Sequence, residues 1–373
     1  MPSGPTTMKD FVNAAPWWRT DIFTEIVTSG DGVGDFLKLL HERASSPFFI
    51  VDGILEPQTP FRGIFEQNDK FVFDASESEP RTGDVDRVVS LIKSMSYAPD
   101  AIAGVGGGAA MDLAKAVSIC LSNPLPSEKY QGYGLDMARG ADIWVLPTLS
   151  GTGAEVTPIA VLRGPERKLG INNKFVAPVV AVIDPALSAG AKKFNRFFSM
   201  MDCFFHHYEI TKSKTSAEYA VLDAHDGARM AREVLSCDMA EFDIDRAAKS
   251  AAASVLGGSS SIGGRVGVSH AISYGLSNSS PRLPHSVAVT ISMLACRDIY
   301  SDGGWDDTVK FLEINGMSRP TAREYGINGS HVERMTKTAM GMEKLWLSHF
   351  GENWRDTVDE SFVTDIYKRI ISA

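Results

Sequence analysis

Residues 101–115, Ala-Ile-Ala-Gly-Val-Gly-Gly-Gly-Ala-Ala-Met-Asp-Leu-Ala-Lys, join a short apolar run to a helical pattern through three consecutive glycines. The run 101–105 is typical of a buried strand, and 111–121 has the spacing of a helix. Glycines at such a turn let the backbone approach a phosphate, and the free N–H groups that open a helix attract an anion. The stretch predicts an α/β fold with a phosphate-binding turn at Gly106, Gly107 and Gly108, although a tight turn without a ligand has the same pattern.

Other apolar runs in the first half are also followed by Gly, Asp or Thr, and helical patterns such as 84–95 lie between them. Buried strands that alternate with helices indicate a parallel sheet, whose ligands bind beyond the carboxyl ends of the strands. We therefore predict a Rossmann-like dinucleotide-binding domain over residues 1–187. The further predicted strands are 48–51, 70–73, 143–146 and 179–183.

The second half has no strand-like runs, and its apolar residues follow helical spacing. We predict an all-helical metal- and substrate-binding domain over residues 188–373, with the boundary between 184 and 191. The helical patterns cover 217–234, 246–256, 286–300 and 332–347.

The composition argues against nucleic-acid-binding, exported and membrane proteins. The 373 residues carry a net charge of −9 and no long basic run, which argues against nucleic acid as a partner. Residues 1–18 lack the pattern of an export signal, and no apolar stretch approaches the ~18 residues of a membrane span. We expect a cytoplasmic protein whose four cysteines are free thiols, with a small-molecule substrate and no membrane partner.

Two polar features of the first half suggest contacts with a nucleotide. Thr148, Ser150 and Thr152 follow a predicted strand and could donate to phosphate or ribose oxygens, or Thr152 could cap a following helix together with Glu155. Asp52 follows another strand. Its carboxylate would accept hydrogen bonds from a ribose diol and repel a 2′-phosphate, which favours NAD over NADP, although Asp-Gly is also a common turn.

A candidate metal site lies in the second half. Asp202 and His206 have i, i+4 spacing, so they share one face of a helix. His270 and His285 follow in segments that could converge on this pair. Imidazole and carboxylate ligands suit one zinc or iron(II) ion.

Several motifs in the same order resemble the iron-containing (group III) alcohol dehydrogenase family. Gly106-Gly-Gly108 with Asp112 and Lys115 is similar to its glycine-rich stretch, and 147–155 to its Pro-Thr/Gly-Thr-Gly stretch. The resemblance implies metal ligands at Asp202, His206, His270 and His285, and places Lys168 and Asp112 at the cofactor. It also implies a fold like that of dehydroquinate synthase, hydride transfer between an alcohol and NAD(P), and a homodimer.

Closer still is the resemblance to the 3-deoxy-D-manno-octulosonate 8-oxidase branch, through Met201-Asp-Cys203 and residues 270–277. Tyr274 stands where most of the family has a second histidine, so a proton relay through that histidine is excluded. Tyr274 is then the candidate for the relay, and we expect the other candidate, His207, on a helix surface. Loop 278–282 also departs from the branch.

A sugar-acid substrate would need a cation for its carboxylate, for which Arg265 and Arg282 are candidates. The alternatives are a metal-dependent lyase or cyclase of the dehydroquinate synthase type, a simple short-chain alcohol dehydrogenase, and a non-catalytic member of the fold. The full set of metal ligands favours the dehydrogenase.

Overall fold

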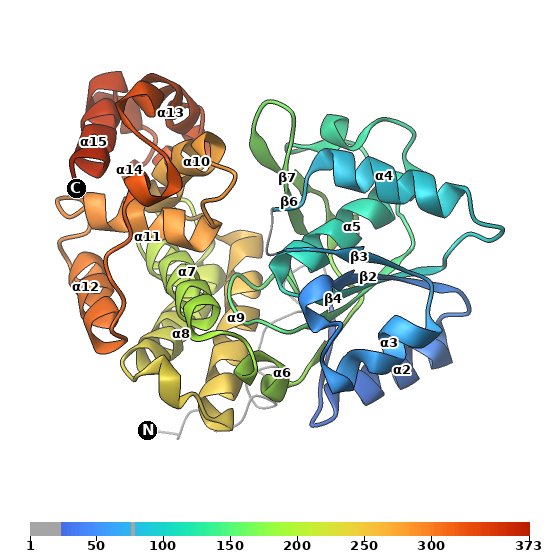
Figure 1. Cartoon of the computed structure of the whole chain (residues 1–373). Helices are drawn as coiled ribbons and strands as arrows, with labels where there is room; N and C mark the ends of the chain where they lie inside the picture. Colours follow the sequence, from blue (N-terminus) through green and yellow to red (C-terminus); the bar gives the residue numbers. More distant parts are fainter. Residues whose placement is uncertain (1–23, 76–78) are drawn as a thin grey trace. The chain divides into compact units, whose positions relative to one another are not determined.

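The computed structural model describes residues 24–75 and 79–373. The segment 1–18, in which we expect no export signal, lies outside the described residues. The chain divides into two compact units, one ending at Ala191 and the other beginning at Lys192. Each unit is described by itself below, with the elements labelled in Figure 1.

The N-terminal unit is built on a six-stranded sheet in which every neighbouring pair is parallel, in the order β1-β8-β5-β4-β2-β3. All five predicted strands are present, and β1 is an addition whose mixed sequence, Glu-Ile-Val-Thr, gave no clear signal. The strands are β1 (Glu25–Thr28), β2 (Pro47–Asp52), β3 (Lys70–Phe73), β4 (Ala101–Gly106), β5 (Asp142–Pro147) and β8 (Val180–Ile183). The prediction of a parallel α/β domain is confirmed.

Alternate residues of the central strands enter two different hydrophobic cores. In β2, Phe49 and Val51 pack with helices α2 and α3, whereas Phe48 and Ile50 pack with α4 and α5. This two-residue period is that of a strand covered on both faces. Among the described residues of this unit, the α-helices are α2 (Gly32–Arg43), α3 (Arg62–Gln67), α4 (Thr82–Lys93), α5 (Gly108–Ser122) and α6 (Pro185–Ala189).

An antiparallel hairpin of β6 (Ile159–Arg163) and β7 (Lys168–Asn172) lies outside the main sheet. Its residues Ala160, Leu162 and Ile171 join the core formed by α4 and α5. This hairpin was not predicted from the sequence, although residues 159–162 of β6 form a short apolar run; in β7 the apolar residues alternate with Lys, Gly and Asn over only five positions.

The C-terminal unit, residues 192–373, is fully described and contains helices and no strand. The predicted all-helical character is confirmed, although the single pattern at 332–347 is broken at Gly341 and Met342 into two helices. Its helices are α7 (Lys193–Thr211), α8 (Glu218–Leu235), α9 (Ile244–Gly263), α10 (Val268–Ser279), α11 (His285–Ala295), α12 (Gly304–Ile314), α13 (Val332–Met340), α14 (Glu343–Phe350) and α15 (Glu360–Ser372).

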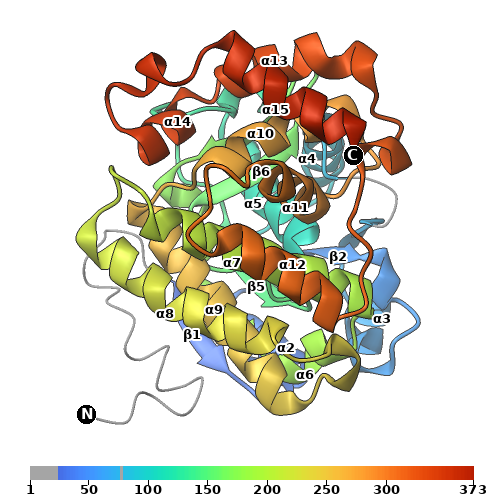
Figure 2. The same cartoon turned by 90° about the vertical axis from the view of Figure 1, so that its left-hand side faces the viewer.

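Helix α7 is the centre of this unit. It packs against α8, α9, α11 and α12, which Figure 2 shows around it. Phe197, Met201, Phe204 and Phe205 are fully buried, so the helix is apolar around most of its circumference. A polar side chain on such a helix is held in the interior. Across the described residues, no helix has the length and apolar character needed to cross a membrane.

Candidate metal centre and nucleotide-binding turn

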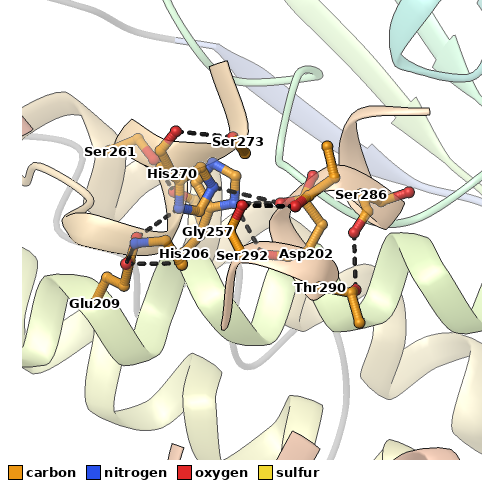
Figure 3. Close-up of polar contacts among 12 residues, drawn as sticks. Asp202, His206, Glu209, Gly257, Ser261, His270, Ser273, Ser286, Thr290 and Ser292 are labelled. Carbon is orange, nitrogen blue, oxygen red and sulfur yellow. Dashed lines mark hydrogen bonds and ion pairs between the residues drawn. The ribbon is translucent and has the colours of Figure 1, made fainter. Parts of the chain in front are cut away.

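Three of the four predicted metal ligands meet inside the helical unit. One ligand atom from each of Asp202, His206 and His270 lies within 4.8 Å of those of the other two. Asp202 and His206 lie one turn apart on α7, and His270 lies in the first turn of α10. Figure 3 shows the side chains side by side.

The arrangement brings possible metal-ligand atoms face to face. Asp202 Oδ1 lies 3.4 Å from His270 Nε2, and both atoms are buried without a hydrogen-bond partner among the described residues. His206 Nδ1 lies 2.9 Å from the carbonyl oxygen of Asp202, which leaves its Nε2 as the free ligand nitrogen. Buried polar atoms without partners are costly unless a cation satisfies them. The residues present therefore fit a divalent metal ion.

His285, the fourth predicted ligand, is the first residue of α11 and is half-buried. Its ring centre lies 5.8 Å from that of His270. It does not belong to the tight group of three, but helix α11 packs against both α7 and α10. His285 thus borders the site, and its role as a ligand stays a prediction.

The electrostatics of the site favour a positive charge. Burial raises the pKa of Asp202, but the imidazoles of His206 and His285 outweigh burial and hold this pKa well below its usual value. Burial lowers the pKa of His270, but Glu209 and Asp202 raise it to about 9. The two carboxylates therefore hold a proton at His270 when no metal ion competes for the site.

Glu209, which the sequence analysis missed, supports this group from α7. Its Oε2 lies 2.5 Å from His270 Nδ1. Figure 3 marks this contact with a dashed line. Burial raises the pKa of Glu209, but the charge of His270 and the hydrogen bonds from His270 and Tyr300 lower it to about 2. Its i+3 spacing from His206 and i+7 spacing from Asp202 place all three on one helix face, and that signal was available in the sequence.

Tyr274, the candidate for the proton relay, is half-buried on α10, and its ring centre lies 6.1 Å from that of His285. The expectation for His207 was wrong. His207 is fully buried, its Nε2 lies 2.9 Å from the carbonyl oxygen of Ala253, and burial lowers its pKa to about 4. It is a residue of the helical core because α7 has almost no solvent-facing surface.

The two arginines proposed for a substrate carboxylate differ in their surroundings. Arg265 Nη1 donates to the carbonyl oxygens of Ser261 and Gly264, at the end of α9. It therefore satisfies backbone groups that the helix leaves open. Arg282 is exposed in the loop that precedes α11.

The predicted phosphate-binding turn lies in the N-terminal unit, where β4 ends and α5 begins at Gly108. Gly106 has a φ of +144°, and a Cβ there would lie 2.8 Å from the Cβ of Asp52. Gly107 and Gly108 have room for a side chain, since the nearest atom to an added Cβ is 3.9 Å away at each. The fold alone requires glycine only at 106, which supports a ligand at the other two.

Asp52 lies beside this turn, because β2 and β4 are neighbours and their carboxyl ends meet. Its Oδ1 accepts a hydrogen bond from the backbone N–H of Ile54 at 3.2 Å and so caps the short helix η2 (Gly53–Leu55). Burial raises the pKa of the carboxyl group, although backbone hydrogen bonds oppose this. Asp52 can cap this short helix and still make the predicted contact with a ribose.

Thr148 also reaches this edge, where its N–H donates to the carbonyl oxygen of Gly106. Ser150 and Thr152 follow and are half-buried. The alternative in which Thr152 and Glu155 cap a helix is wrong, because no helix follows them before β6. The polar loop is irregular, which leaves its hydroxyl groups open to the predicted role.

Asp112 and Lys115 tie α5 to the hairpin. Asp112 Oδ2 accepts a hydrogen bond from the N–H of Val161. The Nζ atom of Lys115, which is fully buried, contacts Asp112 and donates to Thr157 and the carbonyl oxygen of Ile159. The family-like motif thus has a structural task here in addition to the cofactor contact predicted for Asp112.

Lys168, predicted to line the cofactor site, is buried at the start of β7. Its Nζ lies 2.5 Å from Glu79 Oε1, and Arg163 contacts the other oxygen of Glu79. Lys168 therefore has a carboxylate partner in the structure, and its contact with a cofactor stays a prediction.

Part of the chain is similar to a known protein family. Residues 24–185 match the family model of the iron-containing alcohol dehydrogenases. This match agrees, over the residues it covers, with the resemblance inferred from the motifs.

Curated relatives match parts of the chain. Sulfoacetaldehyde reductase of Bilophila wadsworthia is 33% identical over 119 residues, which are 31% of either chain. The 1-propanol dehydrogenase of Citrobacter freundii is 27% identical over 70% of this chain and 68% of its own. The match to the first relative thus spans less than a third of that protein's length.

The fold of the whole chain has solved counterparts. Sulfoacetaldehyde reductase from Bifidobacterium kashiwanohense, solved in complex with NAD⁺, superimposes with a TM-score of 0.77. That likeness covers 94% of this chain and 98% of the other, at 19% identity. It shows a shared two-domain fold.

Proposed function

We propose that this protein is a metal- and NAD(P)-dependent alcohol dehydrogenase that interconverts an alcohol and the corresponding carbonyl compound. The observation that carries the proposal is the buried group of Asp202, His206 and His270, with unsatisfied ligand atoms 3.4 Å apart. Its relatives named above act on alcohols or aldehydes, in agreement with this chemistry.

Asp202, His206, His270 and His285 would hold the metal ion, either Fe(II) or Zn(II). Such an ion supplies Lewis-acid chemistry, which lowers the pKa of an alcohol. The buried helices α7 and α10 fix the ligands and exclude water from them. Tyr274, half-buried near His285, is the side chain that would relay the released proton, accepting it at its phenol oxygen while it passes its own hydroxyl proton to solvent.

Gly106, Gly107, Gly108 and the start of α5 would bind the pyrophosphate of the cofactor through backbone N–H groups. A nicotinamide cofactor supplies the hydride acceptor or donor. Asp52 beside the turn favours NAD, the cofactor in the solved relative, because a carboxylate repels the 2′-phosphate of NADP.

For the substrate we propose a hydroxylated acid of the 3-deoxy sugar-acid type. The support is the run from His270 to Ser277 and the Met201-Asp-Cys203 stretch, which resemble the branch that oxidises a terminal sugar-acid alcohol. Arg282 is the exposed cation nearest in sequence to the fourth predicted ligand, and it is the candidate partner for the acid group.

The test is a spectrophotometric assay of NAD(P)H on the full chain loaded with Fe(II) or Zn(II). The panel contains 3-deoxy sugar acids, sulfoacetaldehyde and 1-propanol with the matching oxidised or reduced partners. We expect turnover that chelation abolishes and the metal restores. Activity that survives complete chelation would contradict the metal-dependent mechanism, and faster turnover of 1-propanol than of any acid would overturn the substrate proposal.

A further inference from the structure

We propose that Glu209 is the positioning residue of the metal centre, which fixes the ring of His270 and the start of helix α10 for metal binding. This inference rests on the metal site of the proposed function. It assigns a task to a buried carboxylate that none of the motifs singled out.

Both carboxylate oxygens of Glu209 are fully hydrogen-bonded. Its Oε1 accepts from the backbone N–H and the hydroxyl group of Ser269, both at 2.7 Å, and from the hydroxyl group of Tyr300. Its Oε2 accepts from the N–H of Gly267 at 2.8 Å and lies 2.5 Å from His270 Nδ1. A carboxylate has about four lone-pair directions, so these donors fill it and prevent its rotation.

Glu209 also fixes which ring nitrogen of His270 carries the proton. An ionised carboxylate accepts hydrogen bonds and donates none, so Nδ1 of His270 must carry a proton. The unprotonated nitrogen in the neutral ring is then Nε2, the atom that lies 3.4 Å from Asp202 Oδ1. Glu209 therefore selects the ligand atom of His270. A carboxylate behind a metal-binding histidine commonly has this effect.

Glu209 also binds backbone N–H groups at the start of α10. Gly267 and Ser269 lie at the start of α10, where N–H groups lack partners within the helix. Glu209 binds both of these groups from α7, the helix that carries Asp202 and His206. One side chain thus sets the position of α10 relative to the two other ligands.

Tyr300 supports Glu209 from a third segment. Its hydroxyl group accepts from the N–H of Val268 at 2.9 Å while it donates to Glu209, and the side chain is almost fully buried. Loss of this hydroxyl group removes one donor from Glu209 but leaves the contact with His270 in place. We therefore expect substitution of Glu209 to weaken metal binding more than substitution of Tyr300.

The experiment measures metal affinity and ligand geometry without any substrate. Wild type, Glu209→Gln and Tyr300→Phe are titrated with Zn²⁺ against a chromophoric chelator, and the visible ligand-field spectrum of each Co²⁺-loaded protein is recorded. We expect Glu209→Gln to weaken Zn²⁺ binding about 10- to 100-fold and to shift the Co²⁺ bands. Tyr300→Phe should weaken binding less and shift the bands less.

Glu233→Gln is the matched control, because Glu233 lies on α8 of the same unit and pairs at the surface with Arg229 and Lys249. It should leave affinity and spectrum unchanged. Wild-type affinity and an unshifted spectrum in Glu209→Gln, with only a lower melting temperature, would overturn the positioning role. If Glu209→Gln does not fold, the same comparison is made with Tyr300→Phe and Ser269→Ala, and an unchanged spectrum in both would overturn it equally.

Failure of this inference is distinct from failure of the proposed function. If the wild type binds Zn²⁺ but oxidises or reduces nothing in the substrate panel, the positioning role of Glu209 stands and the dehydrogenase does not. If the wild type binds no divalent ion, both are overturned.

Discussion

The ring of His207 lies over Gly227, where it occupies the place of a side chain. A Cβ at position 227 would lie 2.0 Å from Cε1 and 2.2 Å from Nε2 of His207. This contact joins the middle of α7 to α8, one residue after the predicted ligand His206.

Gly227→Ala should therefore destabilise the helical unit by about 1–3 kcal/mol, because the added methyl group overpacks a buried contact. Thermal or urea unfolding measures the loss. The control is Gly83→Ala in α4, where no atom lies within 4 Å of an added Cβ and alanine favours the helix. Equal stability of the Gly227→Ala protein and the wild type would contradict the packing of His207.

The predicted ligands should contribute unequally to metal binding. His206→Ala removes a member of the group within 4.8 Å and should reduce the bound metal to a trace. His285→Ala should keep one ion per chain with weaker affinity, because it leaves the close group of Asp202, His206 and His270 intact and water fills the fourth position. Equilibrium dialysis with elemental analysis measures both variants. Comparable loss in the two variants would show that His285 is as central as His206.

The charge of Asp52 should determine the choice between NAD and NADP. Asp52→Asn keeps a side-chain oxygen to cap Ile54 but removes the negative charge. We expect the ratio of kcat/KM for NADPH to that for NADH to rise about tenfold, or about 1.4 kcal/mol, since a repulsion at short range is removed. An unchanged ratio would place the 2′-position of the ribose away from Asp52.

Lys115 should be critical for the stability of the N-terminal unit. Its fully buried Nζ contacts Asp112, Thr157 and the carbonyl oxygen of Ile159. Lys115→Met would leave Asp112 as a buried carboxylate without its cation, which costs about 3–5 kcal/mol. The double variant Lys115→Met/Asp112→Asn should recover part of the loss in chemical unfolding. No recovery would show that the hydrogen bonds to the hairpin outweigh the ion pair.

His349 should make stability depend on pH. Burial lowers its pKa, although the charge of Glu209 opposes this, and its Nδ1 has no hydrogen-bond partner among the described residues. Below pH ~6.5 the unfolded chain takes up a proton that the folded chain resists, so stability is full above this pH and falls below it. His349→Phe should lessen the drop in urea midpoint between pH 7.5 and 5.5 in the chelated protein. An identical drop in both proteins would show that His349 does not cause the pH dependence of stability.

The sequence predicted those elements whose apolar residues are dense and well separated by turns. Strand β4 and helix α5 were evident because both are buried and three glycines lie between them. Strands β1 and β7 were missed, since four or five residues of mixed character carry no clear period, and the short apolar run of β6 was missed with its partner. Their pairing is set by distant partners, such as the contact of Asp112 with Val161.

For the site, the sequence indicated which residue types could bind metal but not which of them are buried together. The i, i+4 pair on α7 followed from helix geometry alone. The convergence of His270 on that pair depends on the packing of α10, which no local pattern encodes. His207 was misplaced for the same reason, because the room for its buried ring is provided by Gly227 of the neighbouring helix.

The predicted ligands Asp202 and His285 lie far apart in the sequence, within helices α7 and α11. An ion that binds only the folded arrangement stabilises it in proportion to the logarithm of its free concentration. A cell short of the metal would then hold a larger unfolded fraction of this protein, exposed to proteases. The abundance of the polypeptide, and not only its turnover of substrate, would then follow the supply of the metal.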